Sequence, residues 1–429
     1  MIGKLIRHTM VAILSLVAAA IPITAQQTQP TSLSDADYAR YTTLRKSGIE
    51  ALFNLDYETA RADFQEIARL FPNHPAGPQL LAAGVWVKTL YKSRRLQTSL
   101  YNSESFYGSG EDKVDPKVVD EFRSLIREAK RLCDIRLKQN PKDVEALVFL
   151  AATSGLKASF EEAVERRHVA ALRDGSDAVD RSREVLKLDP SFVDAKLTIG
   201  LYEYVVGSLP LPIKMIAGIT GFRGSKKRGL ALLEEVAKNG KWWQDDAKTL
   251  LILLYTREQR FSDAFEMARE LSNKYPRNYL LKLETADALV AVAGAERKAK
   301  NVDAAAKAER EAFATFDELL RDRVVRDPAA RSLDLIHFKY GEVLLAAGQP
   351  DRAAKEFLAV TRVEKAEPGL VTMAHLFAAH AFDLLGKRDD AVSQYKEVLA
   401  RPNVYDAHDE AKKGLREPFR LSNQSNNGA

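Results

Sequence analysis

The feature that most constrains this chain is a recurring arrangement of small, large and helix-breaking residues. In residues 44–72 the small residues Gly48 and Ala60 are followed by the bulky Phe64 and Ile67, and Pro72 ends the run. Small residues let two helices cross closely, bulky apolar residues fill the seam between them, and proline ends a helix. The arrangement therefore predicts a pair of antiparallel helices.

Equivalent residues recur further along the chain, whereas strand-like alternation of apolar and polar residues is scarce. The matching positions are Leu251, Tyr255, Phe261, Ala264, Ala268 and Leu271 before Pro276, then Gly341, Leu344, Gly348, Ala353, Phe357 and Val360, and finally Ala379, Phe382, Gly386, Ala391, Tyr395 and Val398 before Pro402. Pro368 and Pro402 are 34 residues apart, and Pro72 and Pro141 are 69 apart. The pattern predicts an all-α solenoid of antiparallel helix pairs, with about five to seven repeats and some overlong helices, one of them running from Glu161 to Leu172.

These residues resemble the tetratricopeptide-repeat (TPR) pattern over most of residues 35–419. The Trp of that pattern is absent, since Leu44, Leu147, Lys196, Lys248 and His337 stand in its place. The resemblance implies a superhelix whose inner groove binds a protein or peptide, with no cofactor and no reaction. Residues 200–230 are also similar to Iml2-like outer-mitochondrial-membrane repeat proteins, which implies an association with membranes or their lipids.

The N-terminus has the three parts of a secretory signal. Lys4 and Arg7 precede an apolar run from Met10 to Ile21, and small or β-branched residues lead to Ala25. A helix of this run would rise about 18 Å, which is short of the roughly 30 Å of a bilayer core. We therefore expect cleavage after residue 25 and export to the periplasm, rather than a membrane anchor.

The net charge and the cysteine content give two further indications, one about nucleic-acid binding and one about disulfide bonds. The formal net charge is +5, and removing Lys4 and Arg7 with the signal leaves +3. Such a balanced chain gives no reason to expect nucleic-acid binding. Cys133 is the single cysteine, so no intramolecular disulfide can form and packing alone must stabilise the exported protein. Its position in the apolar phase of a helix predicts a buried, unreactive thiol.

The expected partner surface is the inner groove, which the first helix of each pair faces in solenoids of this kind. The predicted groove residues are Ile49, Val148, Leu201, Tyr204, Leu253, Arg257, Phe338 and Leu376. They are mainly apolar, which suits an amphipathic helix or a lipid-like ligand. The alternative is that the chain fills the groove with its own overlong helices, such as residues 78–107, and both alternatives stay open.

Residues 207–224 (GSLPLPIKMIAGITGFRG) interrupt the helical pattern, because two prolines and four glycines exclude a regular helix. The residues that would contact a membrane or a partner are Ile213, Ile216, Phe222, Arg223, Lys226, Lys227 and Arg228. One interpretation is a membrane-surface element with a basic end. The other is an insertion packed on the solenoid, with the basic residues at a solvated helix start.

Candidate chemistry is sparse. Glu165 and His168 have the Glu-x-x-His spacing that di-iron bundles use twice, but a second copy is absent. Pairing of the carboxylates Glu161 and Glu165 with arginines on a wet face is the preferred interpretation, so no metal site and no catalytic residue are predicted. His337 and His375 are expected to be packing residues.

We expect residues 1–25 to be the signal peptide, 26–35 a polar linker, 36–140 N-terminal helical repeats, 141–420 a TPR-like solenoid with an insert at 207–224, and 421–429 a disordered tail.

The predicted function is that of an exported, non-enzymatic scaffold that binds a protein or lipid partner at the bacterial envelope, near the outer membrane. The alternative is a solute- or glycan-capturing protein serving an outer-membrane transporter, with Trp242, Trp243, Tyr202 and Tyr204 as stacking surfaces.

Overall fold

The computed structural model describes residues 33–93, 96, 114–165, 167–208, 224–321 and 332–420. In these residues the chain forms consecutive helix pairs without a β-strand, which confirms the predicted all-α solenoid. The pairs are α1 (Asp35–Phe53) with α2 (Tyr57–Leu70), α3 (Ala76–Lys92) with α5 (Pro116–Gln139), α6 (Val144–Ala163) with α7 (His168–Leu188), α8 (Lys196–Gly207) with α10 (Lys226–Asn239), α11 (Gln244–Arg257) with α12 (Phe261–Lys274), α13 (Tyr279–Lys298) with α14 (Val302–Arg321), α16 (Leu333–Ala346) with α17 (Pro350–Val360), and α18 (Pro368–Leu384) with α19 (Arg388–Leu399).

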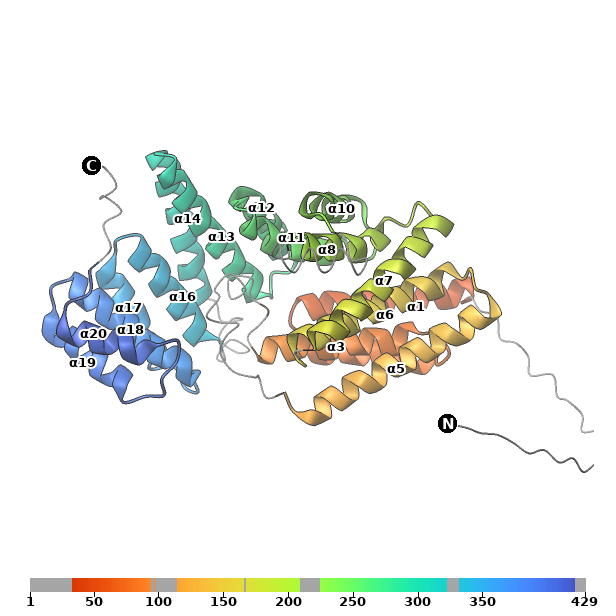
Figure 1. Ribbon diagram of the computed structural model, residues 1–429, viewed down its shortest axis with the longest axis horizontal. Helices are drawn as coiled ribbons and strands as arrows, with labels where there is room; N and C mark the ends of the chain where they lie inside the picture. The colour runs from red at the N-terminus through yellow and green to blue at the C-terminus, as the bar shows by residue number, and fades with distance from the viewer. Residues whose placement is uncertain are drawn as a thin grey trace, which may run out of the picture.

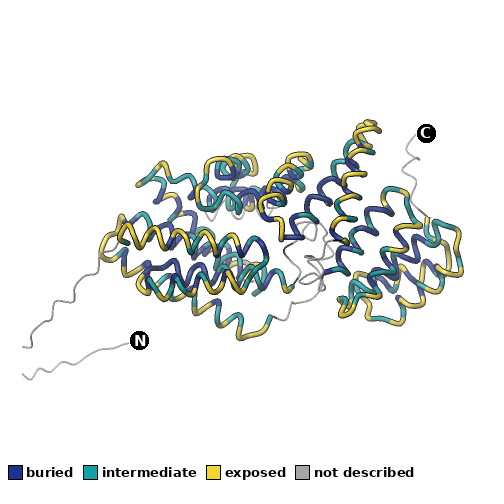
Figure 2. The backbone as a smooth tube through the Cα atoms, turned by 180° about the vertical axis from the view of Figure 1, so that it is seen from behind, coloured by how far each residue is buried: buried dark blue, intermediate teal, exposed yellow. Residues whose placement is uncertain are grey.

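A short 3-10 helix, η2 (Val193–Ala195), leads into α8, and α20 (Ala407–Arg416) packs on the last pair. The described residues thus hold eight helix pairs, more than the five to seven expected. Pairs α1 to α7 lie at one end of the elongated molecule and α16 to α20 at the other (Figure 1). Buried residues line the faces where neighbouring helices meet, and exposed residues follow the outer turns (Figure 2).

In the pairs α1–α2 and α16–α17 a small residue of the first helix packs against a large one of the second, as the sequence pattern predicts. Gly48 of α1 faces the ring of Phe64 in α2, and Gly341 of α16 faces the ring of Phe357 in α17. A Cβ added to Gly341 would lie only 2.7 Å from Cε1 of Phe357, so the crossing leaves no room for a side chain. Phe64 and Phe357 are fully buried. The helices can approach this closely only because glycine lacks a Cβ.

The superhelix closes on itself, because the first repeats contact the middle of the chain. The ring of Phe53, at the end of α1, stacks on Tyr275 with their centroids 4.7 Å apart. Asn278 donates from Nδ2 to the carbonyl oxygen of Phe53 at 2.6 Å. The hydroxyls of Tyr91 in α3 and Tyr279 in α13 lie 3.4 Å apart. Part of the inner space is therefore occupied by the chain's own side chains.

Two local expectations are wrong. The predicted helix through Glu161 to Leu172 is broken, since α6 ends at Ala163 and α7 begins at His168. Pro368 does not end a helix but occupies the first position of α18. Proline is well tolerated there, because the first amide of a helix has no intrahelical partner to lose.

Several predicted segments lie outside the described residues. They are the signal peptide at 1–25, most of the linker at 26–35, most of the insert at 207–224 and the tail at 421–429. Ser34, near the end of that linker, caps α1 by accepting the amide of Asp37 at 3.2 Å. Within the described ranges, no helix combines the length and the apolar composition needed to cross a bilayer.

The small–large crossings can be tested with two glycine variants of opposite expected sign. Gly341→Ala should lower the free energy of unfolding by about 1–3 kcal/mol, because the new methyl overlaps the Phe357 ring. Gly294→Ala should raise it by about 0.5–1 kcal/mol, since a Cβ at this position in α13 meets nothing within 4 Å and alanine favours the helix. Urea unfolding of both variants measures this difference. Changes of equal sign and size would contradict the proposed packing.

Candidate functional site

A cavity of about 330 Å³ lies between α11, α13 and α16, the first helices of three successive pairs. Figure 1 shows α8 and α11 on the inner side of the molecule, with α10 and α12 outside them. The cavity is lined by Ile252, Thr256, Glu284, Asp287, Ala288, Val290, Ala291, Lys339, Glu342, Val343 and Ala346. We call it the inner cavity. Its mixture of apolar walls and a few charged groups is typical of binding sites.

The charged wall of the inner cavity is centred on Lys339. Its Nζ lies 3.6 Å from Oε2 of Glu342 and 4.0 Å from Oδ2 of Asp287. Burial opposes the charge on Lys339, but Asp287 and Glu342 outweigh it and raise the pKa of the ammonium. Burial raises the pKa of Glu342. The groove is therefore less uniformly apolar than expected, since it has a half-buried charge cluster on one side.

The structure separates the eight predicted groove residues into two sets. Val148, Tyr204, Phe338 and Leu376 are buried, and Ile49, Leu201 and Leu253 are half-buried, while Arg257 is exposed. The four buried side chains are core residues, so the orientation expected for their helices is wrong at these positions. A partner role for the other four stays a prediction.

The basic residues after the insert are mostly paired. Lys226 Nζ lies 2.7 Å from Glu258 Oε1, and a guanidinium nitrogen of Arg228 lies 2.8 Å from Glu203 Oε2. Lys227 is exposed. The predicted contact residues Ile213, Ile216, Phe222 and Arg223 lie outside the described residues. Two of the three described cations of this cluster thus bind the solenoid itself.

The two ends of the insert lie side by side. A Cβ on Gly224 would lie 2.6 Å from the amide nitrogen of Gly207. Next to them, α8 and α10 cross at Gly200 and Gly229, where a Cβ on Gly229 would lie 2.6 Å from the Gly200 carbonyl oxygen. The insert therefore leaves and re-enters the helix pair at one point.

The tryptophan pair packs between repeats. Trp242 and Trp243 both meet the ring of Phe192 edge-on, with centroids 5.5 and 6.3 Å apart. Their backbone amides each donate to Oδ1 of the buried Asp194 at 2.8 Å. The guanidinium of Arg45 lies 4.7 Å from the Trp242 ring centroid. The rings are thus held in a structural junction, with contacts on several sides.

The Glu-x-x-His spacing does not form a one-faced pair on a helix. Glu165 lies in the turn after α6, whereas His168 begins α7. Glu165 pairs with Arg123 at 2.6 Å and Arg167 at 3.5 Å, so the expected pairing with an arginine is confirmed for Arg167. The Glu165 side chain is only 9% exposed, so the expectation that it lies on a solvent-exposed face is wrong. Across the described residues, no group of three or more His, Cys, Asp or Glu side chains could hold a metal ion.

The remaining predicted packing residues are buried or half-buried. Burial raises the pKa of the fully buried Cys133 thiol to about 12. His337 Nδ1 lies 2.7 Å from Glu356, and His375 Nδ1 lies 2.7 Å from Gln394. Both partners are 19 residues further along the chain, so the two histidines occupy equivalent repeat positions. Sequence alignment of the two repeats predicts this equivalence, and the contacts confirm it.

No protein-family model and no curated protein matches the chain. Among solved structures, the chain is similar to the human IFIT1 dimer with PPP-AAAA, at 15% identity over 90% of this chain and 86% of that chain, with a TM-score of 0.41. A thermophilic TPR protein in Thermus thermophilus matches at 14% identity over 58% of this chain and 99% of its own, with a TM-score of 0.33. Yeast Tom70 matches at 12% identity over 88% and 87%, also with a TM-score of 0.33.

At these identities the similarities concern the fold alone. The assignment to the class of TPR-like α-solenoids is carried by the helix pairs and their small–large crossings in the chain itself. The expected TPR resemblance is confirmed at this level. Such a fold is typical of scaffolds that bind other proteins on an extended surface.

The junction at Asp194 gives a test of how the Trp pair is held. Asp194→Asn should lower the free energy of unfolding by roughly 2 kcal/mol, because the new amide nitrogen would face the Lys241 amide that now donates to Oδ2, and the negative charge that attracts the three amides would be lost. Tryptophan emission should shift to longer wavelength. Asp180→Asn, on an exposed i,i+3 pair, should change stability by less than about 0.5 kcal/mol. Equal effects of both variants would exclude this role for Asp194.

Proposed function

We propose that this protein is an exported, non-enzymatic scaffold that holds a partner protein at the bacterial envelope. The observation that carries the proposal is the inner cavity, in which apolar side chains from three successive inner helices surround one charged wall. Such a surface accepts an apolar side chain of a partner and offers the charged wall to polar groups beside it.

The partner best suited to this surface is an amphipathic helix. Ile252, Val290 and Val343 line the cavity from α11, α13 and α16, so a helix lying across the three would direct its apolar face into the cavity. Lys339 and Glu342 would meet polar side chains at the edge of its apolar face. A lipid-like ligand is the alternative occupant.

The tryptophan junction gives less support to the glycan-capturing alternative. Stacking on sugars requires an open aromatic face. Trp242 and Trp243 instead pack on Phe192, and Arg45 covers part of the Trp242 ring. Tyr204 is buried and donates its hydroxyl to Glu258 at 2.7 Å. A scaffold that binds its partner in the inner cavity does not require any of these rings to be exposed.

Export is proposed from the composition of residues 1–25, and the periplasm near the outer membrane is the proposed location. The positive start, the apolar run and the small residues before Gln26 match a secretory signal. Lys227 and the insert that precedes it are proposed to approach a membrane surface or the partner.

Site-specific photocrosslinking tests the inner cavity. A photoreactive phenylalanine at Ala291, which lines the cavity, should crosslink to a partner protein in cells, whereas the same group at exposed Glu311 of α14 should not. Ala291→Trp should fill the space and reduce partner recovery at least tenfold, about 1.4 kcal/mol of binding free energy. Undiminished recovery with the filled cavity would rule out this site. Crosslinking to lipid alone would replace the protein partner with the lipid alternative.

Export has a separate test. Residues 1–25 fused ahead of a phosphatase that becomes active only after disulfide formation should give activity in a bacterial host. Leu14→Arg interrupts the apolar run and should abolish that activity, because the segment no longer partitions into an apolar environment. Equal activity of both fusions, or none with the natural segment, would overturn the export proposal.

A further inference from the structure

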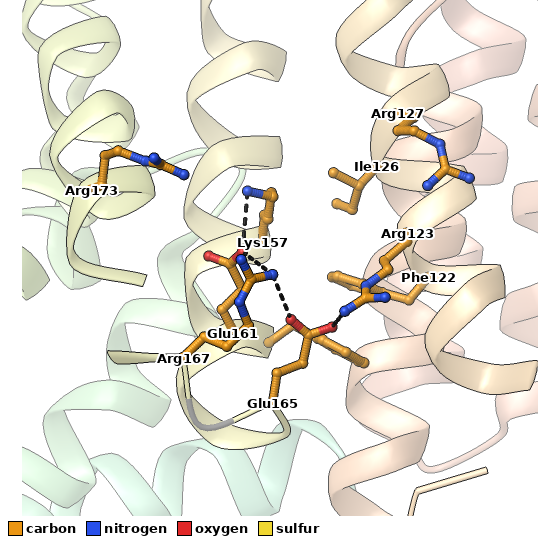
Figure 3. A pocket seen from close by; sticks show the side chains of 10 residues that line it. Phe122, Arg123, Ile126, Arg127, Lys157, Glu161, Glu165, Arg167 and Arg173 are labelled. Atoms are coloured by element: carbon orange, nitrogen blue, oxygen red, sulfur yellow. Dashed lines mark ion pairs between the residues drawn. The ribbon is translucent and has the colours of Figure 1, made fainter. Parts of the chain in front are cut away.

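A second cavity, of about 200 Å³, lies between α5, α6 and the start of α7 (Figure 3). Its apolar lining consists of Phe122, Ile126 and Phe160, and the rings of Phe122 and Phe160 stack with centroids 3.9 Å apart. The charged lining consists of Arg123, Arg127, Lys157, Arg167 and Arg173 with Glu161 and Glu165. We call it the arginine cavity.

Both carboxylates of the arginine cavity are engaged by cations. Glu165 contacts Arg123 at 2.6 Å and Arg167 at 3.5 Å. Glu161 contacts Lys157 at 3.2 Å and Arg167 at 3.6 Å. Their side chains are only 9% and 4% exposed, so both carboxylates lie at the bottom of the site. Each buried negative charge is thus shared between two positive ones.

Arg127 and Arg173 remain without such a partner. Both are exposed, and neither makes an ion pair or a hydrogen bond to another described residue. They come from α5 and α7 and lie on opposite sides of the cavity (Figure 3). The lining therefore has five cationic side chains and two carboxylates. A third carboxylate, that of Asp174, pairs with Lys157 from outside the lining. Two positive charges remain in excess.

We propose that the arginine cavity binds a phosphoryl group, either free or carried on a lipid head group or a small metabolite. The planar guanidinium fork suits the oxygens of a phosphate, which can accept two parallel hydrogen bonds from each arginine. A phosphate monoester carries close to two negative charges at neutral pH, and this matches the excess. The buried Phe122 and Phe160 exclude water from one wall and strengthen the attraction.

The charge balance argues against a cation in this place. Within the described residues no three metal-ligating side chains come together, and the five surrounding cations would repel a metal ion. Burial raises the pKa of Glu161, and the neighbouring Asp174 adds to this effect. Proton uptake by Glu161 would lower the negative charge at the bottom of the cavity. An anion would then meet less repulsion there.

This site is separate from the inner cavity, and its test does not depend on the partner proposal. Titration calorimetry of the full chain with inorganic phosphate in a chloride buffer should give a dissociation constant below about 1 mM. The double variant Arg127→Gln/Arg173→Gln should bind at least tenfold more weakly. Both side chains lack partners in the described chain, so the variant should keep its fold, and an unchanged thermal midpoint without phosphate checks this.

The matched control is Arg310→Gln/Arg416→Gln, which removes two exposed arginines that make no ion pair with another described residue and changes the net charge equally. It should bind phosphate within about twofold of the natural chain, since the affinity depends on the cavity and less on the overall field. Phosphate should also raise the thermal midpoint of the natural chain and of this control, but not of the cavity variant. An equal loss of affinity in both double variants would overturn the proposal.

Three further probes identify the source of the phosphoryl group. Glycerol phosphate binding as tightly as phosphate supports a small metabolite, and binding to phosphatidic acid vesicles but not to phosphatidylcholine vesicles supports a head group. Succinate binding as tightly as phosphate would refute selection for a phosphoryl group. Absence of binding to phosphate, glycerol phosphate and both vesicles would refute the site.

Discussion

The close crossing of helices at glycine is the interaction on which the rest of this structure depends. Gly48 against Phe64 and Gly341 against Phe357 bring two backbones together where any side chain would collide with a ring. The resulting pairs bury their large residues against each other, and the next pair continues the same core. The stacking of these pairs then determines where the two cavities lie. It also brings Asp194 to the tryptophan amides and sets the point at which the insert leaves the solenoid.

The sequence predicts the helix pairs well, because their packing is encoded by neighbours within one repeat. Ala60, Ala264, Ala353 and Ala391 were expected at crossings, and each is no more than 1% exposed. The break between α6 and α7 was missed, since residues 164–167 contain neither glycine nor proline. The expected continuous helix from Glu161 to Leu172 shows that a helix end is hard to predict when the connection contains no helix-breaking residue.

The candidate sites were harder to predict than the fold. Ile252, Val290 and Val343 meet in the inner cavity although they lie in three different pairs. Helical periodicity indicates which face of a helix is apolar, but not how far each pair rotates relative to the next. Because of that rotation, Tyr204 and Leu376 are core residues, whereas Leu201 and Leu253 are half-buried. The charge cluster around Lys339 depends on the same rotation.

The contact between the first repeats and the middle of the chain also changes how the molecule should unfold. Repeat arrays behave as one-dimensional chains, in which each unit is stabilised only by its neighbours and the ends fray first. Here Asn278 and Phe53 are 225 residues apart in sequence and are joined by a hydrogen bond. The terminal pair α1–α2 is thus held at two places, and its loss should weaken the middle pairs as well. This closure couples distant repeats into one cooperative unit, and it should form late in folding because its loop entropy is large.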